Sequence, residues 1–90
     1  MKTSLIIPAW NAEKTILDCI LSAIEANDSP EEIIIVDDCS DDKTANLILN
    51  FKDKYSKIKL LKMKVNSGPS AARDYGVKKA NGEIIFFTDS

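Results

Sequence analysis

The segment EIIIVD at residues 32–37 limits the folds open to this chain more than any other feature. Its interior is apolar and rich in β-branched residues, a composition typical of a strand that is buried on both faces. Such strands are typical of parallel sheets, where helices cover the two sides. The segment therefore predicts an α/β fold built around a central parallel sheet.

The rest of the chain alternates between strand and helix patterns. Further strands are expected at residues 3–8, 58–65 and 83–88. Helices are expected between the strands, with Asn11 and Ser40 at the starts of the first two. The third is expected over residues 70–80, with Gly82 ending it in the left-handed conformation. The order βαβαβαβ predicts one Rossmann-like domain over residues 1–90, a parallel sheet flanked by helices with no internal boundary.

Two local patterns add detail to this architecture. The alternation of the strand at 58–65 slips between Leu60 and Leu61, which a bulge or burial of both faces would explain. The slip would place Ile58 and Leu60 on one face, and Leu61, Met63 and Val65 on the other. Small residues recur at every fourth position of the third helix and let it lie close to the sheet; they are Ala72, Gly76 and Ala80.

The composition excludes several classes of function. The 90 residues carry a formal charge of -2, two Cys and no His, which removes His-based catalysis and the usual zinc sites and leaves two thiols expected to be reduced. No apolar run approaches the ~20 residues of a membrane span. With no signal peptide recognised either, the expected location is cytoplasmic, with any membrane association made through regions outside this chain. The lysines between Lys43 and Lys64 alternate with apolar residues and lack interleaved aromatic rings, so they favour a solvated face and no nucleic-acid partner.

Polar and turn residues follow all four expected strands. In a parallel sheet of this kind, ligands bind in the crevice at the carboxyl ends of the strands. These ends are occupied by residues 8–11, 37–40, 66–68 and 89–90. Function is therefore expected where these four segments meet.

Three carboxylates in this crevice could carry chemistry. Asp37 and Asp38 directly follow the buried strand and would be costly there without a partner. They could accept hydrogen bonds from a ribose or a nucleobase N–H, although one of them could merely cap the second helix. Asp89 ends the fourth strand, where it would either bind a divalent cation together with ligand phosphates or cap the element that follows.

The single arginine and the single tryptophan each allow two interpretations. Arg73 lies in the first turn of the third helix, where it could bind a diphosphate bidentately or pair with a nearby acid. Trp10 lies on the first loop, either as a ring at the edge of the core or as a platform that stacks on a base. Cys19 is interpreted as a small apolar residue without chemistry.

Three stretches of the chain, in this order and at this spacing, resemble a known family: SLIIPAWNAEKTI, EIIIVDDCSDDKT and NSGPSAARDYGVKKANGEIIFFTDS. They resemble the N-terminal half of the family 2 inverting glycosyltransferases, which have the GT-A fold, over Thr3 to Ser90. The resemblance implies a half-domain that binds a nucleotide-sugar donor together with Mn2+ or Mg2+. Trp10 replaces a more usual tyrosine, Cys39 a small residue that is often glycine, and Asp74 a frequent asparagine.

The resemblance also implies how the base would be bound. Pro8, Ala9 and Trp10 would border the uracil and ribose of a UDP-linked donor. Asp38 would accept the base N–H, with Asp37 supporting the ribose or the loop. Replacement of Asp38 by Ala is then expected to abolish nucleotide binding and to leave the melting temperature nearly unchanged.

Four further residues would lie on the diphosphate side. By the same resemblance, Asn66, Gly68 and Arg73 belong to the segment that faces the diphosphate. Asp89 resembles the first residue of the family's DxD motif, which binds the metal ion. Asp89 is therefore both a donor-binding residue and the candidate metal ligand.

A complete enzyme of this family would transfer the sugar to an acceptor hydroxyl with inversion, using a carboxylate base. The resemblance puts that base, the acceptor site and the second aspartate of the motif beyond Ser90. No catalytic residue is therefore expected within these residues, and the chain alone is expected to be inactive. The acceptor is left open between a glycan, a lipid-linked and a protein substrate, and self-association through an exposed sheet edge is expected.

Two other functions are compatible with the same order of elements. A dinucleotide-binding Rossmann domain also has an acid after its second strand, but PAWNAE contains no G-x-G-x-x-G that would let a pyrophosphate approach the backbone. A non-catalytic nucleotide-binding or interaction module is the second alternative. Glycosyl transfer by the full-length protein is the preferred interpretation.

Overall fold

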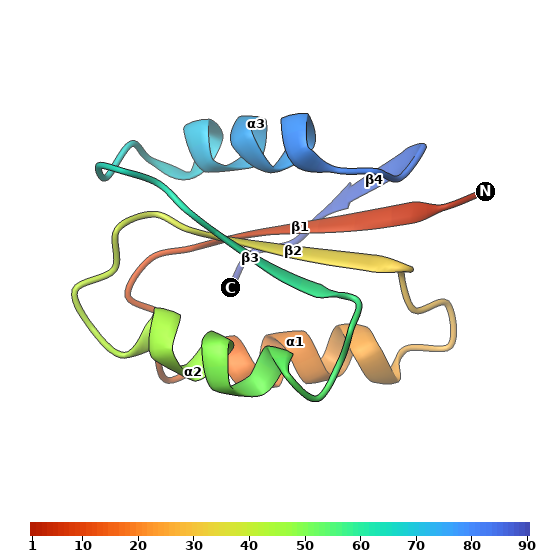
Figure 1. Cartoon of the computed structure of the whole chain (residues 1–90), viewed down its shortest axis with the longest axis horizontal. Coiled ribbons are helices and arrows are strands. Elements are labelled where there is room, and N and C mark those ends of the chain that lie inside the picture. Colours follow the sequence, from red (N-terminus) through yellow and green to blue (C-terminus); the bar gives the residue numbers. More distant parts are fainter.

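A four-stranded parallel sheet forms the centre of the structure, a computed structural model that describes residues 1–90 (Figure 1). The strands are β1 (Thr3–Ala9), β2 (Glu32–Asp37), β3 (Ile58–Lys62) and β4 (Ile84–Phe87), in the spatial order β3-β2-β1-β4. The helices are α1 (Ile16–Glu25), α2 (Thr44–Lys52) and α3 (Pro69–Lys79). Helices α1 and α2 cover one face of the sheet and α3 covers the other (Figure 1). The predicted α/β architecture with a parallel sheet is confirmed.

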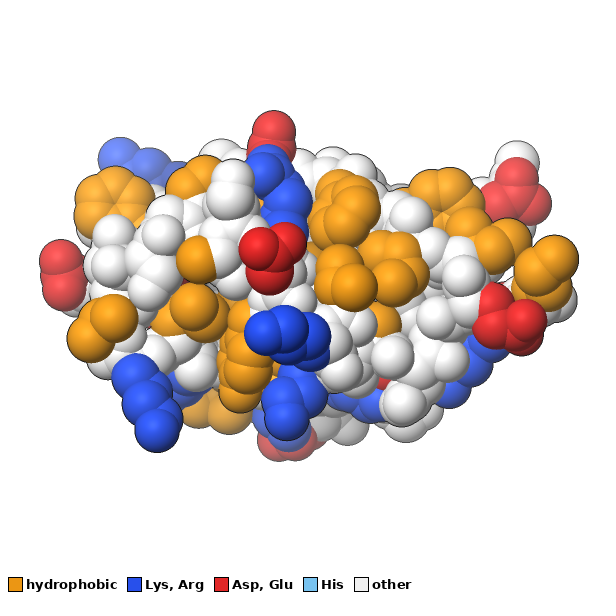
Figure 2. All heavy atoms as spheres, turned by 90° about the horizontal axis from the view of Figure 1, so that it is seen from above, with side chains coloured by type: hydrophobic (Ala, Val, Ile, Leu, Met, Phe, Trp, Pro, Cys, Tyr) orange, Lys and Arg blue, Asp and Glu red, His pale blue; other side chains and the backbone are white.

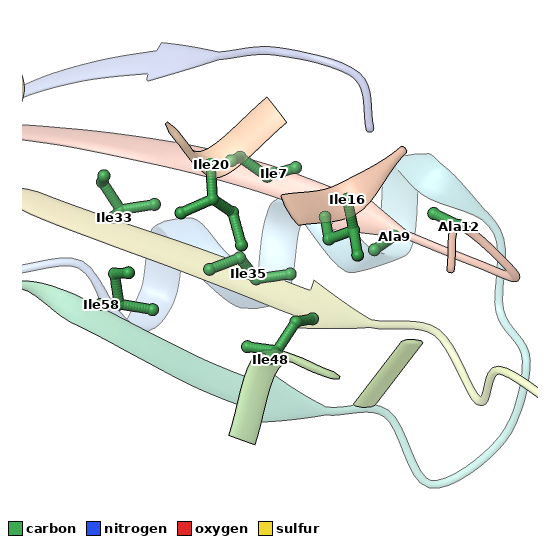
Figure 3. Close-up of a cluster of buried hydrophobic side chains, with 9 residues drawn as sticks. All are labelled: Ile7, Ala9, Ala12, Ile16, Ile20, Ile33, Ile35, Ile48 and Ile58. Atoms are coloured by element: carbon green, nitrogen blue, oxygen red, sulfur yellow. The ribbon is translucent and has the colours of Figure 1, made fainter. Parts of the chain in front are cut away.

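Strand β2 is the most buried element, because a strand pairs with it on each side and helices cover both its faces. Its side chains alternate between two apolar clusters. Ile33 and Ile35 point towards α1 and α2, where nine buried side chains meet (Figure 3). Ile34 and Val36 point the other way and pack with Ile6 and Ala72 beneath α3. The continuous apolar run thus predicts the double burial correctly.

Helix α3 lies close to the sheet because its inner face is made of small residues. Ala72 and Gly76 are buried, and Ala80 packs against the same cluster. A Cβ atom on Gly76 would lie only 2.6 Å from Cγ2 of Ile6 and 3.2 Å from Cγ2 of Val36. The stripe of small residues seen in the sequence is therefore the contact surface of the helix.

The first two helices begin later than the sequence patterns predict. Helix α1 begins at Ile16, so the expectation that Asn11 caps it is wrong; Asn11 lies in the preceding loop with a positive φ of 47°. Helix α2 begins at Thr44, so Ser40 does not start it. The physical reason is the same in both cases, because each side chain accepts a backbone N–H from the neighbouring loop and not one from its own helix: Ser40 accepts that of Asn11, and Asn11 accepts that of Asp41.

The third strand and the turn after α3 also differ in detail. Strand β3 ends at Lys62, and Val65 is exposed because the chain has already left the sheet. The pairing with β2 continues without a bulge, and burial on both faces explains the slip, since Leu60 packs on one cluster and Leu61 on the other. The sequence predicts a left-handed conformation for Gly82, but its φ is not positive. A Cβ atom there would lie 2.8 Å from the backbone nitrogen of Ser4, so close approach to β1 is what requires glycine.

Strand β4 leaves one edge of the sheet unpaired. Phe86 and Phe87 on this strand are 53% and 51% exposed, which is unusual for large apolar side chains. On the α3 side of the molecule, apolar side chains reach the surface among scattered charged ones (Figure 2). Self-association through the edge stays a prediction. None of the three helices has the length and apolar character needed to cross a membrane.

A buried carboxylate stabilises the amino end of the sheet. Glu32 is 2% exposed; its Oε1 accepts hydrogen bonds from the Ser4 hydroxyl at 2.6 Å and from the Asn81 backbone N–H at 2.9 Å, and its Oε2 is paired with the Lys59 ammonium. Burial by itself would raise the pKa of Glu32. The hydrogen bonds from Lys59, Ser4 and Asn81, together with the charge of Lys59, outweigh burial and lower that pKa from 4.5 to about 2.

We expect Glu32→Gln to lose stability that depends on pH. Because the pKa of Glu32 is lower in the folded state than in the unfolded state, the carboxylate contributes fully above about pH 5, and its contribution fades as the pH falls towards about 2. At neutral pH the variant should lose up to about 3 kcal/mol in free energy of unfolding. Urea denaturation across this pH range measures the difference, with the exposed Glu31→Gln as matched control; a difference that is constant with pH would contradict it.

We expect Gly76→Ala to destabilise the fold, although alanine favours helices. The new methyl group would overlap Ile6 and Val36, and overpacking of this kind typically costs about 1 to 3 kcal/mol, more than the about 1 kcal/mol of helix propensity gained. Thermal or urea denaturation measures the effect. In an Ile6→Ala background, which removes the clashing methyl group, the same substitution should cost less; an equal cost in both backgrounds would refute the explanation.

Candidate functional site

A cleft of about 260 Å³ lies at the carboxyl ends of β1, β2 and β4. It is lined by Pro8, Ala9, Trp10, Asp38, Pro69, Asp89 and Ser90. A smaller hollow of about 140 Å³ shares three of these residues and is lined by Trp10, Asp38, Asn66, Gly68 and Pro69. The crevice therefore lies where the strand order predicts it, and seven of the nine candidate site residues line one or both hollows, all except Asp37 and Arg73.

Asp38 lines both hollows while its carboxylate holds a neighbouring loop. The side chain is only 3% exposed. Its Oδ1 accepts a hydrogen bond from the backbone N–H of Ser67 and its Oδ2 from that of Gly68, each at 2.8 Å. Asn66 reinforces the same contact by donating its side-chain amide to the Asp38 carbonyl at 3.0 Å. Each carboxylate oxygen keeps a second lone pair for a ligand, so Asp38 can shape the cleft and still accept from a base.

Asp37 lines neither hollow. Its side chain is buried, and Oδ1 accepts hydrogen bonds from the Ser40 hydroxyl at 2.5 Å and from the Ser40 backbone N–H at 3.3 Å. Of the two roles expected for Asp37, support of the ribose or of the loop, this geometry supplies the second. Cys39, two residues after Asp37, has a positive φ of 59°, a conformation that favours glycine and accounts for the preference for a small residue there.

Trp10 stands on the loop between β1 and α1 and is 55% exposed. It is therefore not a ring at the edge of the core, and it forms a wall shared by both hollows. The loop behind it is bound by side chains from the segment after β2. The backbone N–H groups of residues 11, 12 and 13 donate in turn to Ser40, Thr44 and Asp42.

Arg73 reaches the rim of the cleft through an ion pair with Asp89. The distance from Nη2 of Arg73 to Oδ1 of Asp89 is 3.1 Å, and the Asp89 side chain is 88% exposed. The pairing of Arg73 with a nearby acid is thus what the structure shows, and the acid is the candidate metal ligand itself. Exposed pairs of this kind are worth little in stability and open readily to a ligand.

Cys19 contacts the same tail of the chain and carries no chemistry of its own. Its thiol donates to the Asp89 carbonyl at 3.5 Å. Burial raises the pKa of the Cys19 thiol, and the negative charge of Asp89 adds to the effect. A thiol that stays protonated is a weak nucleophile. This agrees with the interpretation of Cys19 as a small apolar residue.

The candidate metal ligand in this cleft is the exposed Asp89 carboxylate, since the oxygens of Asp38 already accept two backbone N–H groups. Nowhere in the structure do three or more His, Cys, Asp or Glu side chains come together as a metal site. The Asp89 carboxylate is exposed beside the cleft, and oxygen ligands of this type suit Mg2+ and Mn2+. A cation bound there would take its remaining ligands from phosphate oxygens and water, which is how Mg2+ is commonly held at nucleotide sites.

Sequence reasoning missed three residues of the site, and it placed Ser90 at the crevice without giving it a role. Pro69 lines the cleft, and Asp42 and Thr44 hold the loop that carries Trp10. The Gly-Pro turn before α3 could have pointed to the first. No sequence pattern near Thr44 indicates that its hydroxyl accepts the Ala12 N–H. In the sequence Thr44 occupies an ordinary inward-facing position of a helix, and only the fold brings the β1–α1 loop against it.

We expect Asp38→Ala to lower the free energy of unfolding by about 2 to 4 kcal/mol, because two backbone N–H groups lose a charged acceptor. This revises the expectation of an unchanged melting temperature, which overlooked the structural role of the carboxylate. Denaturation by urea or heat checks it. Asp89→Ala removes an exposed carboxylate from the same cleft and is the matched control; equal, small effects of both variants would contradict the loop-holding role.

The comparisons with known proteins agree with this geometry. The model of Glycosyl transferase family 2 matches residues 4–90. An uncharacterized glycosyltransferase of Haemophilus influenzae is 41% identical over 87 residues, which are 97% of this chain and 35% of that protein. The chain spans only 15% to 35% of the length of the curated relatives it matches.

Two solved structures show the same fold with nucleotide sugars bound. S. aureus TarS 1-349 in complex with UDP-GlcNAc is 35% identical, with a TM-score of 0.84 over 99% of this chain and 26% of that one. The mannosyltransferase PcManGT from Pyrobaculum calidifontis, in complex with GDP-Man and Mn2+, is 25% identical, with a TM-score of 0.82 over 98% of this chain and 27% of that one. The parallel sheet, the cleft at its carboxyl ends and the match along nearly the whole chain lead to one conclusion: this chain belongs to glycosyltransferase family 2 and has the GT-A type of fold.

Proposed function

We propose that the protein containing this chain is a glycosyltransferase that binds a UDP-linked sugar and transfers the sugar to an acceptor hydroxyl with inversion. The observation that carries the proposal is the cleft at the carboxyl ends of the strands, where an aromatic wall, a buried carboxylate and an exposed carboxylate face one space in a family 2 chain. Related proteins supply the donor class, since TarS was solved with UDP-GlcNAc and PcManGT with GDP-Man.

The nucleobase would lie between Trp10 and the Asp38–Pro69 side of the cleft. A planar base can stack on the exposed indole, an interaction worth about 1 to 3 kcal/mol for each base. Asp38 lines both hollows, and each of its carboxylate oxygens can accept a second hydrogen bond, so it can bind a base that presents an N–H group. Uracil has such a group between its two carbonyl oxygens, but so does guanine at its own ring N–H. The preference for UDP is supported by the higher identity to TarS, solved with UDP-GlcNAc, than to PcManGT, solved with GDP-Man.

The diphosphate would lie towards Asp89 and Arg73. When the Asp89–Arg73 pair opens, the guanidinium can bind phosphate oxygens in a bidentate manner. A Mg2+ or Mn2+ ion held by Asp89 and the phosphates would supply positive charge against the diphosphate as it leaves. Arg73 would orient the donor from α3. The loop that precedes this helix is the one held by Asp38.

The reaction we propose breaks one bond and forms one. The acceptor oxygen forms a bond to the anomeric carbon as the bond from that carbon to the diphosphate oxygen breaks, and the pair of electrons leaves with UDP. The hydroxyl proton goes to a carboxylate base, which we do not assign to any residue of this chain. Attack from the face opposite the diphosphate inverts the anomeric configuration.

We expect UDP to bind the protein more tightly than GDP or NADH when Mn2+ is present. Trp10→Ala should weaken UDP binding by about 1 to 3 kcal/mol, about 5-fold to 150-fold, because the stacking surface is lost, whereas Trp10→Phe should keep most of the affinity. Isothermal titration measures all three ligands, and Leu49→Ala, an exposed apolar position on α2, is the matched control.

The same protein, supplied with UDP-sugars and tested acceptors, should release UDP and give a product of inverted configuration by NMR. Nucleotide binding without sugar transfer to any acceptor would favour a non-catalytic binding module. Tighter binding of NADH than of UDP, without a metal, would favour a dinucleotide-binding domain and overturn the proposal.

A further inference from the structure

We propose that the hydroxyl groups of Ser40 and Thr44 position Trp10, and so set the width of the nucleotide cleft. Neither hydroxyl lines the cleft. Both act through the loop between β1 and α1, whose backbone they bind from the segment after β2. The part of the inference that concerns nucleotide affinity rests on the proposed function; the part that concerns Trp10 does not.

The first hydroxyl forms a relay from a loop amide to a buried carboxylate. The backbone N–H of Asn11, the residue after Trp10, donates to Oγ of Ser40 at 2.9 Å. The Ser40 hydroxyl in turn donates to Oδ1 of Asp37 at 2.5 Å. Because an amide can only donate, its bond to Ser40 directs the hydroxyl proton towards the carboxylate.

The second hydroxyl repeats this arrangement one residue further along the loop. The backbone N–H of Ala12 donates to Oγ1 of Thr44 at 2.8 Å, and the Thr44 hydroxyl donates to Oδ1 of Asp42 at 2.5 Å. Thr44 is completely buried, so this hydroxyl is not in contact with solvent. Oδ2 of Asp42 binds the next amide directly, that of Glu13, at 3.2 Å.

One hydrogen bond runs in the opposite direction, from the segment after β2 to a side chain of the loop. We call the whole set of these bonds, made by Asn11, Ser40, Asp42 and Thr44, the clasp. Oδ1 of Asn11 accepts the backbone N–H of Asp41 at 2.8 Å. Asn11 has a positive φ of 47°, in the left-handed region that asparagine tolerates better than most residues with a side chain. Three successive amides and one side chain of the loop are thus fixed directly behind Trp10.

Trp10 itself has little else to hold it. The indole is 55% exposed and belongs to neither apolar cluster. A ring that packs in the core is positioned by its neighbours, but an exposed ring on a loop is positioned by its backbone. The clasp is therefore the device that keeps the stacking wall in place before a nucleotide arrives, and such preorganisation raises affinity by lowering the ordering cost of binding.

The test removes each hydroxyl and follows Trp10 in the free protein. Thr44→Val keeps the shape of the side chain, Thr44→Ser restores the hydroxyl, and Ser40→Ala removes the other relay at a less buried position. Each variant is also made with Trp10→Phe, so that subtraction isolates the fluorescence of Trp10. Thr3→Val is the matched control, because the Thr3 hydroxyl accepts the Glu31 N–H at the opposite end of the sheet.

We expect Thr44→Val and Ser40→Ala to increase acrylamide quenching and lower the fluorescence anisotropy of Trp10, with Thr44→Ser close to the unaltered protein. With the sugar donor, KM should rise about threefold to tenfold while kcat stays within about twofold, because the clasp acts on binding and not on the bond that breaks. Thr3→Val should lower the melting temperature and leave Trp10 and KM unchanged.

The inference is overturned if Thr44→Val and Ser40→Ala lower the melting temperature but leave the quenching and anisotropy of Trp10 like those of Thr3→Val. Their hydroxyls would then be structural only. If the unaltered protein binds no nucleotide, the proposed function fails, but the fluorescence of the free protein still decides whether the hydroxyls position Trp10. Should Thr44→Val fail to fold, Ser40→Ala with the same readouts decides the question.

Discussion

Carboxylates that follow the buried strand β2 hold the loops of the cleft together. Asp38 accepts two amides from the loop before α3, and Asp37 and Asp42 terminate the hydroxyl relays from the loop after β1. A buried carboxylate costs several kcal/mol unless its oxygens receive hydrogen bonds, and loop amides lack the partners that helices and sheets provide. The carboxylates accept hydrogen bonds that originate from the loop amides, directly or through a hydroxyl, so both gain partners. These bonds hold the two loops against the end of β2.

The same solution appears at the opposite end of β2. Glu32 is buried there and binds Ser4 of β1, Lys59 of β3 and the Asn81 backbone after α3. The apolar run of β2 therefore lies between Glu32 at one end and Asp37 and Asp38 at the other, all of which accept hydrogen bonds. The apolar part pairs with both neighbouring strands through regular backbone bonds, while the acids bind the connections, so one short strand organises both the core and the loops.

This arrangement joins stability to function at the cleft. Asp38 both shapes the loop before α3 and faces the space where a base would bind, so its removal affects the two together. Asp89 is the opposite case, since its side chain is exposed and pairs with Arg73, a contact that it can exchange for a ligand. The cleft therefore combines one buried, hydrogen-bonded carboxylate with one exposed carboxylate.

The sequence by itself determined the order of the elements, the double burial of β2, the close approach of α3 and the place of the cleft. The first three follow from the periodicity of apolar and small residues, which is a local property of the sequence. The place of the cleft follows from the rule that parallel strands end at one edge of the sheet, which depends only on the order of the elements. Only the tertiary structure decided that Asn11, Ser40 and Thr44 form a clasp and that Asp38 holds residues 67 and 68. Hydrogen bonds between loops about 30 residues apart depend on how the strands are placed side by side, and no local pattern of amino acids records which amide will lie opposite which oxygen.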